Sequence, residues 1–163
     1  MKNLTNQPTL NLQGDLTKLF QFAGHLLQGY HEQFTEPENN WPKDVCRGLV
    51  YLNKDLFKTG SSIKGMKEKN GTPQNNFSMR FKRYVGRTPR DYKTYHRINA
   101  SLFLLSDEKL IELSIGNIGW LVGYENPQTF SMVFKSKTQL SPGKWRKRRG
   151  NSGKNGEKNE EKI

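Results

Sequence analysis

An internal repeat is the feature that most constrains the fold of this chain. Residues 77–92 (FSMRFKRYVGRTPRDY) match residues 130–145 (FSMVFKSKTQLSPGKW) at an offset of 53, with six of sixteen positions identical. Upstream, Gly71 matches Gly123 at an offset of 52, so the second copy holds one extra residue. Self-similarity at a fixed spacing indicates one structural unit used twice. The sequence therefore predicts two related subdomains.

Each copy has the pattern of two short helices joined by a turn with glycine. In the second copy an apolar stripe ends at Gly123, Asn126-Pro127 supplies an N-cap followed by proline, and Phe130 and Phe134 share one face of the next helix. The corresponding residues of the first copy are Gly71, Thr72-Pro73, Phe77 and Phe81. This is the helix-turn-helix pattern, whose second helix enters the major groove of DNA. A protein-binding helical array is the alternative, but such arrays usually need about three repeats or more.

The elements outside the repeat are also predicted to be helical. Apolar residues at spacings of three and four predict a linker helix over about 89–105 and a supporting helix over about 43–57. The predicted fold class is all-α, with two helix-turn-helix subdomains joined by a linker helix. An extra N-terminal helix precedes these elements.

Three segments follow from this division. Residues 1–42 form an N-terminal extension, and residues 43–146 hold the two subdomains (first about 43–88, linker about 89–105, second about 107–146). Residues 147–163 form a basic tail, which is expected to be unstructured because it cannot bury a core.

The extension carries an amphipathic helix over about 15–34, with Asp15 as N-cap. Its apolar stripe consists of Leu16, Leu19, Phe20, Ala23, Leu27, Tyr30 and Phe34. Packing on the core and contact with a second copy or another protein both remain open for that stripe.

The charge distribution points to a polyanionic partner. The formal net charge is +12 with a pI near 9.9, which favours nucleic acid first and an acidic membrane surface second. Residues 58–100 carry 11 basic and 2 acidic side chains, and residues 130–149 carry 7 basic and none acidic. Residues 101–129 between them carry 1 basic and 4 acidic. The two basic blocks coincide with the second half of each repeat.

The sequence lacks the residue groupings expected of a metal-binding protein, an enzyme or a membrane protein. The three histidines (His25, His31 and His96) have no metal-ligand spacing, and the lone Cys46 falls on the apolar side of the supporting helix as a core thiol. No Ser/His/Asp or Cys/His grouping suggests an enzyme, and no cofactor is expected. No apolar run approaches the roughly 20 residues of a membrane-spanning helix, and the N-terminus lacks a signal-peptide core. We expect a soluble, cytoplasmic, nucleoid-associated protein.

Residues 114–146 (SIGNIGWLVGYENPQTFSMVFKSKTQLSPGKWR) resemble the second helix-turn-helix of the AraC/XylS transcription regulators. The matching features are Gly123-Tyr124, Phe130, Phe134-Lys135, Ser141-Pro142 and Arg146. Arg97-Ile98, Ala100 and Leu104-Leu105 resemble the linker helix of that family, and residues 43–92 resemble its first helix-turn-helix more weakly. The resemblance implies a bacterial, non-enzymatic DNA-binding regulator of seven helices, in which two recognition helices insert into adjacent major-groove segments. Residues 1–42 are too short for the sensor domain of many members, so no effector site is expected.

The sequence departs from the family pattern at four positions. Met79 and Met132 stand where the recognition helices commonly carry arginine, so the base preference of relatives does not transfer. Lys67 replaces a small residue, whereas Gly119 keeps it in the second copy, which predicts looser packing in the first. Gln139 replaces the glycine that Gly86 supplies, at a cost on the order of 1 kcal/mol if that turn needs a positive φ.

The inward phenylalanines define which side chains face DNA. The predicted base contacts are Gln74, Asn75, Ser78, Met79, Gln128, Thr129 and Met132. Asn and Gln pair with adenine, and Met or a Thr methyl packs on the thymine methyl, so the site is expected to be biased to A·T pairs. The predicted phosphate contacts are Lys82, Arg83, Lys135, Lys137 and Arg146. Arg80 lies nearer the core side and is a further candidate for reaching a phosphate.

The leading hypothesis is a sequence-specific regulator that binds double-stranded DNA. The alternative is a basic protein that binds DNA or RNA without sequence preference, with a steep salt dependence and no preferred site. RNA polymerase or another regulator, and a dimer formed through the N-terminal helix, are open as protein partners. No membrane partner is expected.

Overall fold

The computed structural model describes residues 14–69 and 76–156, with side chains described to residue 149. Every regular element in these ranges is helical, which confirms the predicted all-α class. The α-helices are α1 (Leu16–Tyr30), α2 (Lys43–Asp55), α3 (Ile63–Lys69), α4 (Phe77–Val85), α5 (Pro89–Ser106), α6 (Ile115–Leu121), α7 (Pro127–Thr138) and α8 (Pro142–Gly156). Two short 3₁₀ helices, η1 (His31–Gln33) and η2 (Glu108–Leu110), follow α1 and α5.

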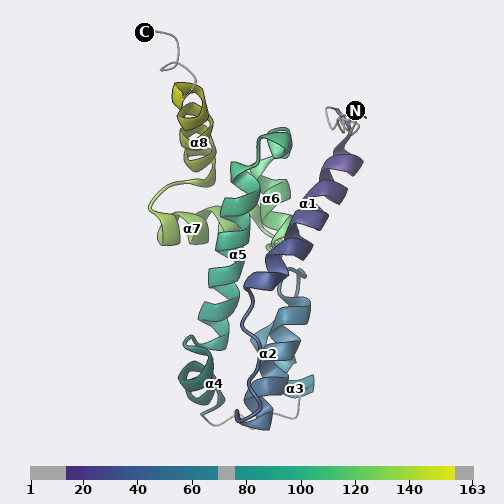
Figure 1. Cartoon of the computed structure of the whole chain (residues 1–163), viewed down its shortest axis with the longest axis vertical. Coiled ribbons are helices and arrows are strands. Elements are labelled where there is room, and N and C mark those ends of the chain that lie inside the picture. The colour runs from purple at the N-terminus through teal and green to yellow at the C-terminus, as the bar shows by residue number, and fades with distance from the viewer. Residues whose placement is uncertain (1–13, 70–75, 157–163) are drawn as a thin grey trace, which may run out of the picture.

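Helix α5 is the axis on which both subdomains are built (Figure 1). Helices α2 and α4 pack against α5 in the first subdomain, and α6 and α8 pack against it in the second. In the view of Figure 1, α7 lies to the left of the middle of α5, α4 lies at the lower end of α5, and α1 lies to the right of α5. The second helices of the two repeats are therefore separated along the length of the linker helix in this view.

The helix boundaries follow from capping side chains in the sequence. Asp15 caps α1 by accepting from the Lys18 N–H at 3.2 Å, as predicted. Asn126 caps α7 by accepting from two successive N–H groups at 2.8 and 3.0 Å, with Pro127 at the first helical position, also as predicted. The predicted cap of the first copy, Thr72-Pro73, lies outside the described residues. There the described helix begins only at Phe77, after Asn76 in a left-handed conformation with φ 62°.

The turn after each recognition-type helix needs the left-handed conformation. Gly86 adopts φ 84° after α4, and Gln139 adopts φ 64° after α7. The turn after α7 therefore has the positive φ at which glutamine in place of glycine is expected to cost stability. A residue with a Cβ pays on the order of 1 kcal/mol for this backbone, which glycine avoids.

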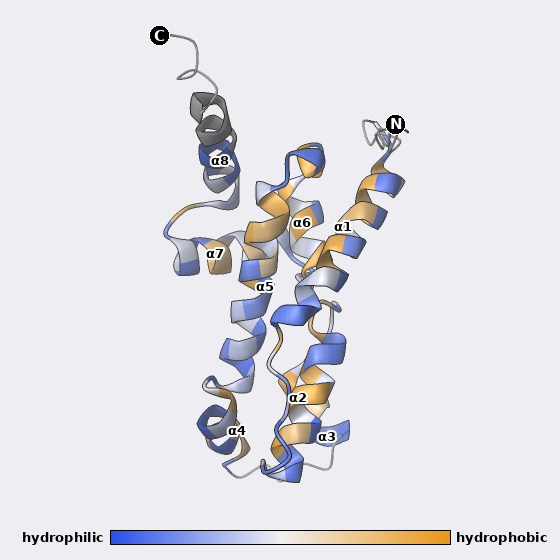
Figure 2. Cartoon of the chain, in the orientation of Figure 1, coloured by the Kyte–Doolittle hydropathy of each residue, from blue (hydrophilic) through white to orange (hydrophobic). Residues whose placement is uncertain are grey.

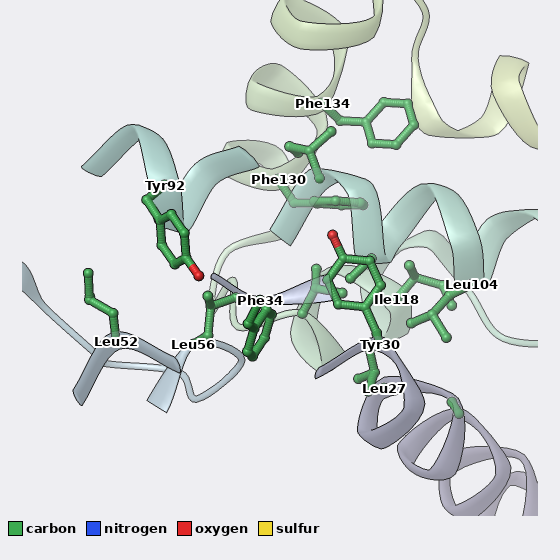
Figure 3. Close-up of a cluster of buried hydrophobic side chains, with 14 of the residues drawn as sticks. Leu27, Tyr30, Phe34, Leu52, Leu56, Tyr92, Leu104, Ile118, Phe130 and Phe134 are labelled. Atoms are coloured by element: carbon green, nitrogen blue, oxygen red, sulfur yellow. The ribbon is translucent and has the colours of Figure 1, made fainter. Parts of the chain in front are cut away.

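The core runs continuously from one subdomain to the other. Phe77, Phe81, Phe130 and Phe134 are fully buried, which confirms the predicted inward faces of α4 and α7. Figure 3 shows buried side chains of α1, α2, α5, α6 and α7 converging in one cluster. The hydropathy colouring shows the matching pattern, with apolar segments of the helices turned toward one another (Figure 2). The two repeats thus share one hydrophobic core.

The N-terminal helix is part of that core. Leu19, Ala23, Leu27 and Tyr30 of α1 are buried, and Phe34 is buried just after η1. The sequence allowed this stripe either to pack on the core or to contact a second copy or another protein, and the structure supports packing on the core. Leu16 is the exception in the stripe, since its side chain is 56% exposed.

Glycine permits the close approach of α6 and α7. A Cβ at position 119 would lie 2.8 Å from Cδ1 of Phe130, closer than real Cβ contacts allow. In the first copy the corresponding room is made on α2, where a Cβ on Gly48 would lie 2.7 Å from Cζ of Phe77. Lys67 instead lies over the Phe77 ring, with Nζ 6.0 Å from its centroid. Phe77 is as fully buried as Phe130, so the lysine does not open the first core.

Substitution of two glycines on α6 should give effects of opposite sign. Gly119→Ala is expected to lower the free energy of unfolding by about 1–3 kcal/mol, because the methyl group overpacks the contact with Phe130. Gly116→Ala on the same helix meets nothing closer than 3.6 Å and should raise that free energy by about 0.5–1 kcal/mol through helix propensity. Urea unfolding followed by circular dichroism measures both. Equal stability of the two variants would contradict the packing described for Gly119.

Regular structure continues further at the C-terminus than predicted. The unstructured tail was expected from residue 147, but α8 extends to Gly156. Residues 157–163 lie outside the described residues. The start of α8 is stabilised by packing on α5 and α7, and the guanidinium of Arg149 lies 5.3 Å from the Trp145 ring centroid. Lysine and arginine are good helix formers, so residues 147–149 extend a helix that tertiary contacts have started. Residues 150–156 hold three glycines, and their helical conformation has no explanation in helix propensity.

Candidate nucleic-acid interface

The two buried phenylalanines of α7 determine which of its other side chains face the solvent. With Phe130 and Phe134 in the core, the predicted base contacts Gln128, Thr129 and Met132 are exposed. Met132 is 69% exposed, which is unusual for a large apolar side chain on a helix whose other face is fully buried. The structure thus brings these three residues together on the solvent side of one helix.

The outer face of α4 is similar but is described only in part. Met79 is 75% exposed, and Ser78 beside it is half-buried. Met79 and Met132 occupy equivalent repeat positions, so each copy presents one exposed methionine. The other two predicted base contacts of this copy, Gln74 and Asn75, lie outside the described residues.

Four of the five predicted phosphate contacts are free at the surface. Lys82, Arg83, Lys135 and Lys137 are exposed, and all four lie in the last turns of α4 and α7. Lys82 and Lys135 are equivalent in the repeat. These cations flank the two methionine-bearing faces without occupying their centres.

Arg146 is engaged inside the second subdomain. One of its terminal nitrogens donates to the carbonyl oxygens of Leu113 at 2.7 Å and Ile111 at 3.3 Å. Burial lowers the pKa of its guanidinium. The side chain ties α8 to the segment before α6, so we leave Arg146 out of the phosphate contacts proposed below.

Arg80 also has a structural partner. Its guanidinium donates to the Asp44 carboxylate at 2.5 Å, linking α4 to the first turn of α2. The sequence suggested a snorkelling contact to a phosphate for this residue. The observed ion pair instead holds the recognition-type helix of the first copy against its supporting helix.

A buried arginine lies where the two subdomains meet. Arg97 of α5 donates from Nε to the Leu56 carbonyl at 2.8 Å and from its two terminal nitrogens to the carbonyls of Gly123 at 2.6 Å and Lys58 at 2.8 Å. Burial lowers its pKa to about 10, which leaves it protonated at neutral pH. The sequence marked Arg97 only as a family position and gave no sign of these contacts, because their partners lie 26 to 41 residues away.

Of the other titratable candidates, His96 lies in the core, whereas Cys46 is only half-buried and is therefore not the core thiol that the sequence predicted. His96 is buried beside Tyr30, whose hydroxyl lies 3.3 Å from Nδ1, and burial lowers the His96 pKa to about 4. The Cys46 thiol faces the backbone carbonyls of Glu38 and Trp41 at 3.8 Å. Within residues 14–69 and 76–156, no cluster of three or more His, Cys, Asp or Glu side chains is placed to hold a metal ion. No described helix is long and apolar enough to cross a membrane.

Comparison with known proteins agrees with this geometry. The family model of a helix-turn-helix domain matches residues 68–148. The structure is similar to the C-terminal domain of AraT, a response regulator from Geobacillus stearothermophilus, with a TM-score of 0.59 and 25% identity over 68% of this chain and 89% of that one. The chain carries an AraC-type helix-turn-helix region. No curated protein matches the sequence.

A second solved structure has the same AraC-type fold. It is a DNA-binding transcriptional dual regulator from Escherichia coli K-12, with a TM-score of 0.53 and 15% identity over 71% of this chain and 99% of that one. The AraC-type region is a non-enzymatic DNA-binding domain, so the protein is classed as a DNA-binding transcription regulator. Double-stranded DNA is its partner.

Proposed function

We propose that the protein is a sequence-specific transcription regulator that reads two adjacent major-groove segments of one DNA duplex. The observation that carries the proposal is the equivalence of α4 and α7. Both helices bury a pair of phenylalanines, expose a methionine at the centre of the outer face and carry exposed cations in the last turn.

The chemistry of these faces favours A·T pairs. Gln128 can pair bidentately with adenine, and the exposed Met79, Met132 and the Thr129 methyl offer apolar surface to thymine methyl groups. No arginine occupies the centre of either described outer face, so the usual guanine reader is missing there. Gln74, Asn75 and Ser78 complete the proposed base contacts of the first copy.

The phosphate contacts set register without reading sequence. We assign this role to Lys82, Arg83, Lys135 and Lys137, whose side chains are exposed beside the reading faces. Such contacts alone would give binding to any duplex, which is the competing function. The exposed methionines and Gln128 favour the specific function, since a purely electrostatic surface has no need of apolar side chains at its centre.

The proposal assigns no dimer contact to the apolar stripe of α1. Apart from the exposed Leu16 and the half-buried Phe20, that stripe is already buried within a single chain, so a second copy would have to displace it from the core. RNA polymerase or another regulator could meet the protein only on surfaces that DNA leaves free, such as the side of α5 that carries α1 (Figure 1).

Selection from a pool of random duplexes tests the proposal. We expect the bound fraction to converge on a motif of two A·T-biased blocks whose centres lie about 10–10.5 base pairs apart, the spacing of successive major-groove segments on one face. A pool that stays random after repeated rounds would contradict it. A motif with a single block would show that only one of the two helices reads bases.

A further inference from the structure

Arg97 makes contacts that join three parts of the protein at one point. The residue belongs to the linker helix α5 and is buried. Its guanidinium donates to Leu56 and Lys58, which directly follow the supporting helix α2 of the first subdomain, and to Gly123, which forms the turn between the two helices of the second. Three carbonyl groups from both subdomains are therefore held by one side chain.

The surrounding geometry is built to hold that side chain. Gly123 has φ 92°, and a Cβ there would lie 2.5 Å from a terminal nitrogen of Arg97, so the turn fits only glycine. The guanidinium carbon also lies 5.4 Å from the Tyr124 ring centroid. The same two loops approach each other again nearby, since a Cβ on Gly60 would lie 3.5 Å from the Glu125 carboxylate.

The chemistry of arginine suits this place better than that of any other residue. A planar guanidinium presents its N–H groups in a fixed fork, whereas a lysine ammonium is a point charge on a flexible stem. A buried cation bound by three carbonyl oxygens is costly to leave unpaired. Movement of one subdomain relative to the other would break at least one of these bonds.

We propose that Arg97 is a positioning residue that fixes the separation and orientation of the two recognition helices, and thereby the spacing between the two DNA segments the protein accepts. The DNA part of this inference rests on the proposed function. Without the clamp, α4 still packs on α5, and α7 still packs on α6 and α8, which contact α5. The two subdomains are then free to reorient, so the protein should tolerate altered spacing and bind the correct spacing less tightly. Rigid placement improves binding by reducing the entropy lost on association.

The first test measures the geometry without DNA. Spin labels are placed on Met79→Cys and Met132→Cys, both well exposed, in a Cys46→Ser background, and the distance distribution is measured by pulsed electron paramagnetic resonance. The parent should give one narrow distribution, and Arg97→Met a clearly broader or shifted one. Arg90→Met, which removes an exposed arginine from the same helix, is the matched control and should leave the distribution narrow.

The second test measures spacing. Affinities are determined for the selected duplex and for duplexes with one base pair inserted or removed between its two blocks, which shifts them by about 3.4 Å and rotates them by about 35°. We expect the unmodified protein to lose about tenfold or more on the altered spacings, and Arg97→Met to lose about threefold or less relative to its own weaker binding. A uniform loss at every spacing would overturn the inference.

The outcomes separate the clamp from folding and from the proposed function. Arg97→Lys keeps the positive charge but lacks the planar guanidinium, and it replaces Arg97→Met in both tests if Arg97→Met does not unfold cooperatively. Failure of both variants to fold would overturn a positioning role. An unchanged distance distribution in folded Arg97→Met would also overturn it. If no preferred duplex exists, the proposed function fails, yet a broadened distribution still supports the clamp.

Discussion

Replacement of Ala23 by glutamate is expected to lower the free energy of unfolding by about 3–5 kcal/mol, because it places an uncompensated charge in the core. Ala23 is 0% exposed at the centre of the α1 face that packs on the rest of the protein. Core contacts continue toward both ends of the helix, where Phe20 contacts Trp120 of α6 and Tyr30 contacts Phe57 beyond α2. Loss of α1 from the core should therefore destabilise both subdomains.

The matched control is Gln21→Glu, which adds the same charge to an exposed position of the same helix. It should change the free energy of unfolding by no more than about 0.5 kcal/mol. Chemical unfolding of the three proteins gives the comparison. If Ala23→Glu were as stable as Gln21→Glu, α1 would not be integral to the fold, and docking of its stripe on a partner would become the better explanation of that stripe.

Substitutions at a predicted base contact and at a predicted phosphate contact should change the affinity for DNA in two different ways. Gln128→Ala should cost about 1–3 kcal/mol on the preferred duplex and little on random DNA, because a bidentate amide contact exists only with the right base. Lys135→Ala should weaken all duplexes by a similar factor and reduce the slope of log affinity against log salt by about one, since a phosphate is present in every sequence. Both side chains are exposed on α7, so neither change disturbs the core.

Fluorescence anisotropy over a salt series measures both quantities, after circular dichroism has shown that the variants are folded. An equal loss for Gln128→Ala on every sequence would remove this residue from the base contacts. A Lys135→Ala effect confined to the preferred duplex would assign the lysine to base reading instead. Either result would change which residues of α7 are assigned to base contacts.

Much of the fold could be predicted because the deciding interactions are local. Asp15 and Asn126 cap their helices through N–H groups two or three residues away, and periodicity alone places Phe130 and Phe134 in the core. The left-handed turn at Gln139 followed from its repeat partner Gly86. Such features depend on a few neighbouring residues, which the sequence shows directly.

The arginines could not be assigned in this way. Arg80, Arg97 and Arg146 all carry the charge expected of a phosphate contact, but their acceptors lie between 26 and 41 residues away in the chain. Only the packing of the helices decides whether such a side chain reaches solvent or a buried carbonyl. The sequence did not predict that α8 extends to Gly156, because residues 150–156 are rich in glycine and asparagine and have no apolar stripe.

The ratio of two affinities decides whether this protein distinguishes one duplex sequence from others. The selected duplex and a scrambled duplex of equal length and composition are compared by competition at one fixed, physiological salt concentration. We expect the selected duplex to bind at least about 10³-fold more tightly, as it does for specific regulators. A ratio near one, together with a steep salt dependence for both duplexes, would contradict it and identify a basic protein that binds nucleic acid without reading sequence.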